Sequence, residues 1–202
     1  MNTTSPSLRS TALLTDLPTI AFAIGQSTIG TLLAASSLRG ICAVSFGTDE
    51  TLLIRSLRTM FPRHQLVRDQ VALAEATEQI RQMVDEPAEA RTVDLQLDLG
   101  GTNFEKAVWS ALQAIPVGET RTYKDIAQLV GGTPQEVGEA CSANRIALLV
   151  PCHRIIRSDG SLAGFRWGVD RKKMLLQRER DAAPDPDSLF ATAALSKGKA
   201  PF

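Results

Sequence analysis

Residues 123–144 read YKDIAQLVGGTPQEVGEACSAN, and this stretch decides the fold of the second half of the chain. Residues 123–130 carry apolar side chains at helical spacing, and Gly131-Gly132 stops that helix. Thr133 then supplies an N-cap, Pro134 a first helical residue and Glu136 the acid of a capping box, so a second helix restarts at once. Two short helices separated by a glycine turn predict a helix-turn-helix.

The flanking segments extend this helical unit. A longer helix, opened by a capping box and closed by a proline and a glycine, is predicted over about 102–115. The apolar run 147–150 indicates a short buried strand that leads into Pro-Cys-His-Arg at 151–154, and a last helix covers about 169–180. We therefore expect a mostly helical domain with a helix-turn-helix over residues 102–181.

The first half has a different pattern. Apolar stretches punctuated by glycines predict three short strands, and helical periodicity predicts two amphipathic helices. A further strand is expected where apolar and polar residues alternate. These elements lie at 20–22, 30–34, 41–46, 50–60, 71–84 and 92–99. They favour a small α/β domain over residues 17–99, with a short antiparallel sheet and a hinge at Gly100-Gly101, so the whole chain is α+β. Residues 1–16 and 182–202 lack periodicity and are expected to be disordered.

Composition excludes few functions. The 202 residues hold 22 Lys and Arg against 22 Asp and Glu, but residues 1–100 have a balance of −3 and residues 101–181 of +3. This asymmetry permits DNA binding without requiring it. No apolar run approaches the roughly 18 residues of a membrane span, and no secretory segment follows the N-terminus. We expect a cytoplasmic monomer that does not contact a membrane.

The cysteines and histidines point away from a structural metal site. Cys42, Cys141 and Cys152 are an odd number without a C-x-x-C pair, and His64 and His153 are the two histidines. A disulfide framework or a zinc site is therefore not expected, and neither is a cofactor.

Pro151-Cys152-His153-Arg154-Ile155 is the segment most informative about chemistry. A thiol is nucleophilic as its thiolate, and a neighbouring histidine and positive charge can lower the pKa of the thiol. The alternative is a buried structural cysteine followed by a basic pair that faces solvent, since free cysteines are often part of the core. The five residues alone leave both interpretations open.

The wider sequence resembles the 6-O-alkylguanine-DNA alkyltransferases, within them most closely the C-terminal half of bacterial Ada. The likeness is weak over the first half and extends, strongly from residue 102 onward, to residue 181. It rests on Phe104, Val108-Trp109, Leu112, Ile115 to Thr120, Thr122-Tyr123, Ile126-Ala127, Ala140 to Asn144, Val150 to Ile156, Asp159 to Gly168, Lys173, Leu175-Leu176 and Glu179.

The resemblance implies an RNase H-like first domain and a winged-helix-like second domain, and it implies direct, single-turnover repair of DNA. Cys152 would attack the alkyl carbon on the exocyclic oxygen of 6-O-alkylguanine, or of 4-O-alkylthymine, and would keep the alkyl group as a thioether. His153 would take the thiol proton through a water molecule, and Glu179 would hold the imidazole. Asn144 would brace the turn around the cysteine. Tyr123 would donate a proton or hydrogen bond to the leaving base.

The resemblance also implies binding of double-stranded DNA that contains an alkylated guanine. The base would be rotated out of the duplex, with the helix that begins near Pro134 in the minor groove. Small residues would let that helix lie close to the bases, other residues would contact phosphates, and the loop 158–168 would wall the base pocket. Besides Tyr123, the residues implied in these contacts are Thr102, Thr133, Pro134, Gly138, Ala140, Cys141, Ser142, Ala143, Arg145, Ile155 and Arg166.

Two positions depart from the family pattern. Gln135 stands where the family usually has an arginine that fills the place of the extruded base, so this residue brings no charge and less stacking. Phe165 stands where a tyrosine is common, which removes one polar contact to the base. An alternative function is therefore a protein that binds alkylguanine in DNA and transfers its alkyl group weakly or not at all. Relatives of that kind lack the nucleophilic cysteine, which this chain has at Cys152.

Overall fold

The computed structural model describes residues 17–87 and 95–183. In the first half, three strands form an antiparallel meander and a fourth, short strand pairs in parallel with the first, so that the sheet order is β3-β2-β1-β4. The elements are β1 (Thr19–Ser27), β2 (Gly30–Ser37), β3 (Gly40–Gly47), α1 (Glu50–Met60), β4 (Gln65–Arg68) and α2 (Ala74–Asp85).

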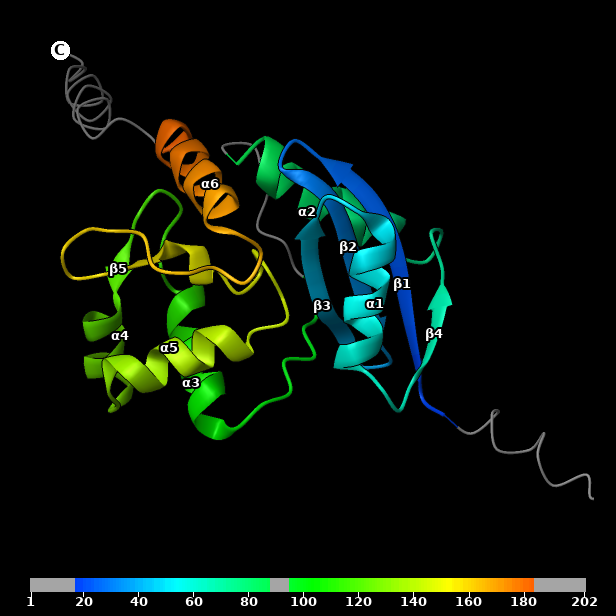
Figure 1. Ribbon diagram of the computed structural model, residues 1–202, viewed down its shortest axis with the longest axis horizontal. Helices are drawn as coiled ribbons and strands as arrows, with labels where there is room; N and C mark the ends of the chain where they lie inside the picture. Colours follow the sequence, from blue (N-terminus) through cyan, green and yellow to red (C-terminus); the bar gives the residue numbers. More distant parts are fainter. Residues whose placement is uncertain (1–16, 88–94, 184–202) are drawn as a thin grey trace, which may run out of the picture.

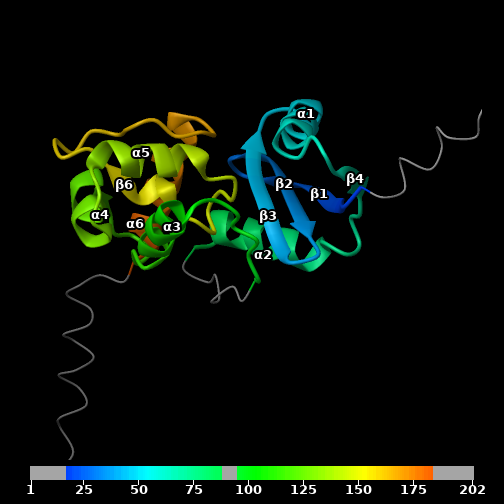
Figure 2. The same cartoon turned by 90° about the horizontal axis from the view of Figure 1, so that it is seen from below.

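The sheet is covered on both faces, as Figures 1 and 2 show. Alternate residues of the strands point to opposite sides. One set, with Phe22 and Leu33, packs with Leu53 and Leu57 of α1. The other set, with Leu32, packs with α2 in the cluster that continues into the second half of the chain. The α+β class expected from the sequence is confirmed.

The second half is mainly helical (Figure 1), and the segment that carries Cys152 lies between α5 and α6 in the sequence. They are α3 (Asn103–Gln113), β5 (Arg121–Thr122), α4 (Tyr123–Val130), α5 (Pro134–Ala143), the 3-10 helix η1 (Cys152–Arg154), β6 (Ile155–Ile156) and α6 (Val169–Ala182).

Capping and turn residues place the helix-turn-helix as the sequence predicts. Thr102, Thr122 and Thr133 each accept from a backbone N–H three residues on, and the acid at that position completes a capping box. Gly131 closes α4 with φ 74°, a left-handed conformation that glycine adopts without strain. The indole N–H of Trp109 donates to the carbonyl of Ala140 at 2.9 Å, which fixes α3 against α5.

The outer edge of β3 joins the two halves. The backbone N–H of Val44 donates to the carbonyl of Arg145, and the N–H of Ala147 donates to the carbonyl of Val44, each at 3.0 Å. Further along the strand, Ile41 exchanges backbone hydrogen bonds with residues 96–98. The edge that would otherwise be open is thus paired to the segment that follows α5.

Two expectations need correction, and one strand was not expected. Residues 147–150 form turns rather than a strand, and Leu148 has φ 70°. The pairing with β3 is limited to the bridge between Val44 and Ile146 and the hydrogen bond from Ala147. The expected strand 92–99 is extended, with a single bridge at Leu97, over its described part. Strand β4 was not predicted, because Gln65–Arg68 is short and mostly exposed. The expected disordered ends lie outside the described residues, apart from 182–183.

Candidate active site

Cys152 is the first residue of η1 and lies in the floor of a pocket. Its side chain is buried, with 6% of the residue exposed. The amide Nδ2 of Asn144 donates to its Sγ at 3.3 Å and to the carbonyl of Val150 at 3.0 Å. The Asn144 Oδ1 accepts from the N–H of Ile146 at 2.8 Å. One buried side chain at the end of α5 therefore holds both the turn before the cysteine and the sulfur itself.

The pKa of Cys152 is shifted in the opposite direction to the one that its neighbours in the sequence suggest. Burial raises the pKa of Cys152, while the hydrogen bond from Asn144 and the charge of Lys172 act in the opposite direction without reversing the shift. The resting side chain is therefore a thiol, and a base has to remove its proton during the reaction. Lys172 of α6 is fully buried, and its ammonium group donates to the carbonyl of Ile155.

A buried network of charged and polar groups lies behind the cysteine. The Nε2 of His153 lies 2.8 Å from Oε1 of Glu179. Arg154 donates from Nη2 to Oε1 at 2.8 Å and from Nε to Oε2 at 2.9 Å of the same carboxylate, and from Nη1 to the carbonyl of Ile115 at 2.6 Å. Burial alone would raise the pKa of Glu179, but the hydrogen bonds from His153 and Arg154 lower it to about 2. Glu179 is thus a carboxylate.

This network sets the tautomer of His153. A carboxylate can only accept, so the imidazole carries its proton on Nε2 and has its lone pair on Nδ1. Nδ1 is buried and has no hydrogen-bond partner among the described residues. Burial lowers the pKa of His153, although Glu179 acts to raise it, so the ring is neutral at neutral pH. A neutral imidazole one residue from a thiol is a suitable general base.

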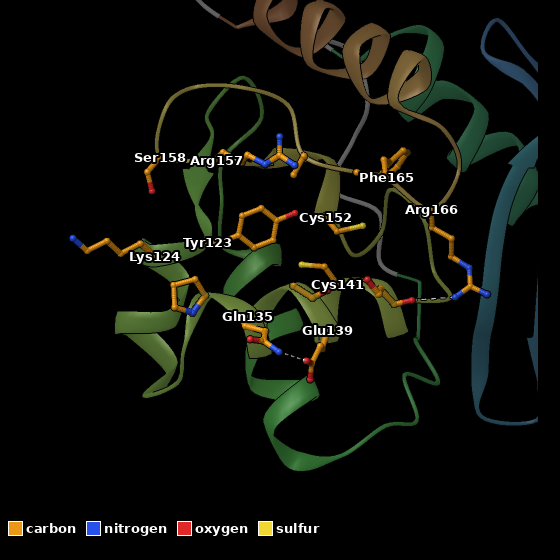
Figure 3. Close-up of a pocket in the computed structure, with 15 residues that line it drawn as sticks. Tyr123, Lys124, Gln135, Glu139, Cys141, Cys152, Arg157, Ser158, Phe165 and Arg166 are labelled. Atoms are coloured by element: carbon orange, nitrogen blue, oxygen red, sulfur yellow. Dashed lines mark hydrogen bonds between the residues drawn. The ribbon is translucent and has the colours of Figure 1, made fainter.

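The pocket above the sulfur has a volume of about 1060 Å³. Figure 3 shows Tyr123 extending from α4 with its hydroxyl toward Cys152, and the loop with Arg157 and Phe165 across the pocket from α5. Arg166 of the same loop also lines the pocket. Burial raises the pKa of Tyr123 to about 12, so its hydroxyl remains a donor. Nη1 of Arg166 donates to the carbonyl of Ser142 at 3.1 Å and so links the loop to α5.

The structure brings many of the sequence-predicted residues together. Cys152 and its neighbours His153, Glu179 and Asn144 form one buried cluster. The predicted residues that line the pocket with Cys152 are Tyr123, Pro134, Gln135, Gly138, Cys141, Ser142, Phe165 and Arg166.

Other predicted contact residues lie elsewhere. Thr102 and Thr133 are engaged in their capping boxes and do not line the pocket. Ala140 faces the core of the helical half, so its side chain does not lie on the exposed face of α5. Arg145 lies past the end of α5, with its guanidinium 5.5 Å from the ring centroid of Phe61. Ile155 is fully buried, and its carbonyl accepts from the ammonium group of Lys172.

Sequence reasoning missed three residues of this region. Arg154 was expected to face solvent if the cysteine was structural, yet it is buried against Glu179. Lys172 was not singled out, although Lys172, Leu175 and Glu179 follow helical spacing and all are buried. Glu139 was passed over between small residues of α5, but it lines the pocket. No signal in a single sequence distinguishes it from an ordinary solvated glutamate.

The described residues contain no group of three or more His, Cys, Asp or Glu side chains that could hold a metal ion. In the same part of the chain, no helix is long and apolar enough to cross a membrane.

Comparison with known proteins identifies the family. The methylated-DNA–protein-cysteine methyltransferase of Methanosarcina acetivorans is 36% identical over 160 residues, which cover 78% of this chain and 97% of the relative. The chain belongs to the methylated-DNA–protein-cysteine methyltransferases. The Candida albicans member of this family is 37% identical, with 72% of this chain and 78% of the relative covered. The family model for the DNA binding domain of 6-O-methylguanine DNA methyltransferase matches residues 103–181.

The family resemblance extends to longer proteins and to solved structures. The Escherichia coli bifunctional transcriptional activator and DNA repair enzyme Ada is 38% identical over 80% of this chain, which spans about half of Ada's length, 46%. The crystal structure of the Mycobacterium tuberculosis O6-methylguanine methyltransferase superposes with a TM-score of 0.68 at 33% identity, covering 85% of this chain and 99% of that one. A structure of M. tuberculosis OGT in complex with DNA has a TM-score of 0.68.

Proposed function

We propose that this protein repairs alkylated DNA by transferring the alkyl group of 6-O-alkylguanine to Cys152, once per molecule. The observation that carries the proposal is a buried thiol at the floor of a pocket with ample room for a base, backed by a neutral histidine whose Nδ1 is available as a base. The family relationship gives independent support, since its members are named for this transfer.

The geometry supports a specific order of proton movements. As Sγ of Cys152 attacks the alkyl carbon, its proton passes through a water molecule to Nδ1 of His153, which has no hydrogen-bond partner among the described residues. The bond between that carbon and the exocyclic oxygen breaks, and the electron pair leaves with guanine. Glu179 stabilises the imidazolium that forms, and Arg154 holds Glu179 in its ionised, oriented state. The hydroxyl of Tyr123 donates to the leaving base. The product thioether has no route back.

DNA is proposed to approach the exposed face of α5. Gly138 and Ser142 have small side chains, so a DNA backbone or base can approach that face of α5 closely next to the pocket. This suits the minor-groove position implied by the family resemblance. The target atom is inaccessible in a stacked duplex, so the base rotates into the pocket. Gln135, at the edge of this pocket, is proposed to hydrogen-bond to the cytosine left behind. Alkylthymine is a further proposed substrate.

The decisive experiment is an intact-mass measurement after incubation with a duplex that contains 6-O-methylguanine. We expect one added methyl group, found in the peptide with Cys152, and no addition in Cys152→Ala. Cys42→Ala is the matched control, because Cys42 is buried in β3 away from the pocket and should leave transfer intact. A methyl group on Cys141 would overturn the site assignment. Tight binding of the lesion without any methyl transfer would favour the alternative of a recognition protein.

We also propose a cytoplasmic location and a monomeric state. The proposed substrate places the protein in the compartment that holds the genome, which in a bacterium is the cytoplasm. Size-exclusion chromatography with light scattering tests the monomer.

A further inference from the structure

The exposed face of α5 carries an acidic side chain where DNA would lie. Glu139 lies one turn after Gln135, and the amide Nε2 of Gln135 donates to its Oε1 at 3.1 Å (Figure 3). Both side chains are exposed and line the pocket. Their immediate neighbours on this face, Gly138 and Ser142, are small, so the long side chain of Glu139 projects beyond them.

The charges around the pocket are distributed unevenly. Among the described residues that line it, Lys124, Arg157 and Arg166 are positive and Glu139 alone is negative. Within the described part of the chain, Glu139 also takes part in no ion pair. The cations suit phosphates, which repel a carboxylate. A carboxylate on this face is therefore favourable only where a base edge offers a hydrogen-bond donor.

The minor groove offers such a donor at one kind of base pair. A·T pairs present only acceptors there, whereas G·C pairs add the 2-amino group of guanine. A carboxylate can only accept, so it meets repulsion over A·T and a charge-assisted hydrogen bond over G·C. We propose that Glu139 reads the 2-amino group of a guanine next to the lesion, and so directs the protein to lesions flanked by G·C pairs. This inference rests on the proposed function, with α5 in the minor groove.

Gln135 contributes to this arrangement. Its hydrogen bond limits the directions that the Glu139 carboxylate can take, so less freedom is lost when the carboxylate meets a base. The same bond orients the Gln135 amide, leaving its second N–H and its carbonyl for the unpaired cytosine. The two side chains thus form one unit, with Glu139 directed to a flanking pair and Gln135 to the site of the lesion.

The test uses base analogues that alter the minor groove alone. Inosine lacks the 2-amino group of guanine but has the same major-groove acceptors, and 2,6-diaminopurine adds a 2-amino group to adenine. Duplexes with 6-O-methylguanine would be flanked by G·C, inosine·C, A·T or diaminopurine·T pairs. Dissociation constants come from fluorescence anisotropy with each protein in the Cys152→Ala background, which leaves the lesion intact. Transfer rates come from single-turnover mass measurements with the full chain and Cys152 in place.

We expect wild type to bind the G·C-flanked lesion about tenfold more tightly than the inosine- or A·T-flanked lesion, and diaminopurine to restore affinity. Inosine·C pairs are also weaker than G·C pairs, and the easier base rotation that results would strengthen binding. Loss of the hydrogen bond to Glu139 would weaken binding, so the direction of the change in affinity distinguishes the two effects. In Glu139→Ala the preference should disappear, with affinity gained for the A·T- and inosine-flanked lesions. Glu75→Ala, which removes an exposed acid on α2, should keep the preference.

The outcomes separate the two proposals. Methyl transfer by wild type without any effect of inosine would refute the role of Glu139 while leaving the proposed function intact. An inosine effect that persists in Glu139→Ala would assign the reading to another residue and would also refute it. Absence of methyl transfer from every duplex would instead refute the proposed function.

Discussion

Replacing Glu179 by glutamine tests the buried network behind the nucleophile. Glutamine keeps the shape of the side chain but leaves the buried guanidinium of Arg154 facing a neutral partner. The pKa of Glu179 is about 2 in the folded protein against 4.5 for an ordinary glutamate. Each factor of ten in proton affinity corresponds to about 1.4 kcal/mol, so the ionised carboxylate contributes about 3 kcal/mol to the free energy of unfolding.

The sign of this contribution gives the pH dependence. Because the pKa is depressed on folding, the stabilisation is fully present above the ordinary pKa of 4.5 and is lost as the pH falls toward about 2. Glu179→Gln should therefore lie about 3 kcal/mol below wild type at neutral pH and approach it in acid, with less than half of the difference left by about pH 3.

Urea unfolding followed by circular dichroism, from pH 7 down to about pH 3, measures this difference. Glu119→Gln is the matched control, because Glu119 pairs with Arg121 at the surface and its loss should change stability by less than about 0.5 kcal/mol. Equal stability of Glu179→Gln and wild type at pH 7, or a difference that does not shrink in acid, would refute the reasoning.

Further predictions concern the reaction, the Gly100-Gly101 segment and DNA binding. The single-turnover rate of methyl transfer should fall in acid, at a pH below the ordinary histidine pKa of 6.5, because burial lowers the pKa of His153; a midpoint above 6.5 would contradict this. Lys172→Met should slow alkylation of the thiol by iodoacetamide, because the charge of Lys172 acts to lower the pKa of Cys152, and an unchanged rate would count against its electrostatic role. Gly101→Ala should lower stability by more than about 1 kcal/mol in thermal unfolding, because φ is 73° and a Cβ would lie 2.7 Å from Trp109. Gly100→Ala, with φ 59° and nothing within 4 Å, controls for the backbone term. Gln135→Arg should lower the dissociation constant for DNA, and no change would argue against DNA contact at this position.

Local chemistry explains why some elements could be predicted from the sequence. Capping boxes and glycine stops act over a few residues, so α3, α4 and α5 begin close to where Thr102, Thr122 and Thr133 place them. Strand β4 depends instead on pairing with β1, which no local pattern in Gln65–Arg68 reveals. The run 147–150 is apolar because it is buried between the two halves, and burial alone does not distinguish a turn from a strand.

The site was predictable as a set of residues but not as an electrostatic arrangement. The motif around Cys152 indicated a nucleophile and a base, yet the direction of the thiol's pKa shift follows from burial, which the sequence does not contain. Arg154 and Lys172 look like solvated charges in a sequence, and only packing of α6 against η1 shows that both are buried. Glu139 gains its interest from the side of α5 on which it lies.

The backbone hydrogen bonds along the edge of β3 allow the first half of the chain to influence the position of the nucleophile. Val44 is bonded to residues 145 and 147, one and three positions beyond the asparagine that holds the sulfur. A sideways slip of the sheet would therefore displace the amide of Asn144 relative to Sγ of Cys152. The sheet therefore helps to fix the position of the nucleophile. A fragment without the sheet would lack the hydrogen bonds that hold residues 145 and 147 in place.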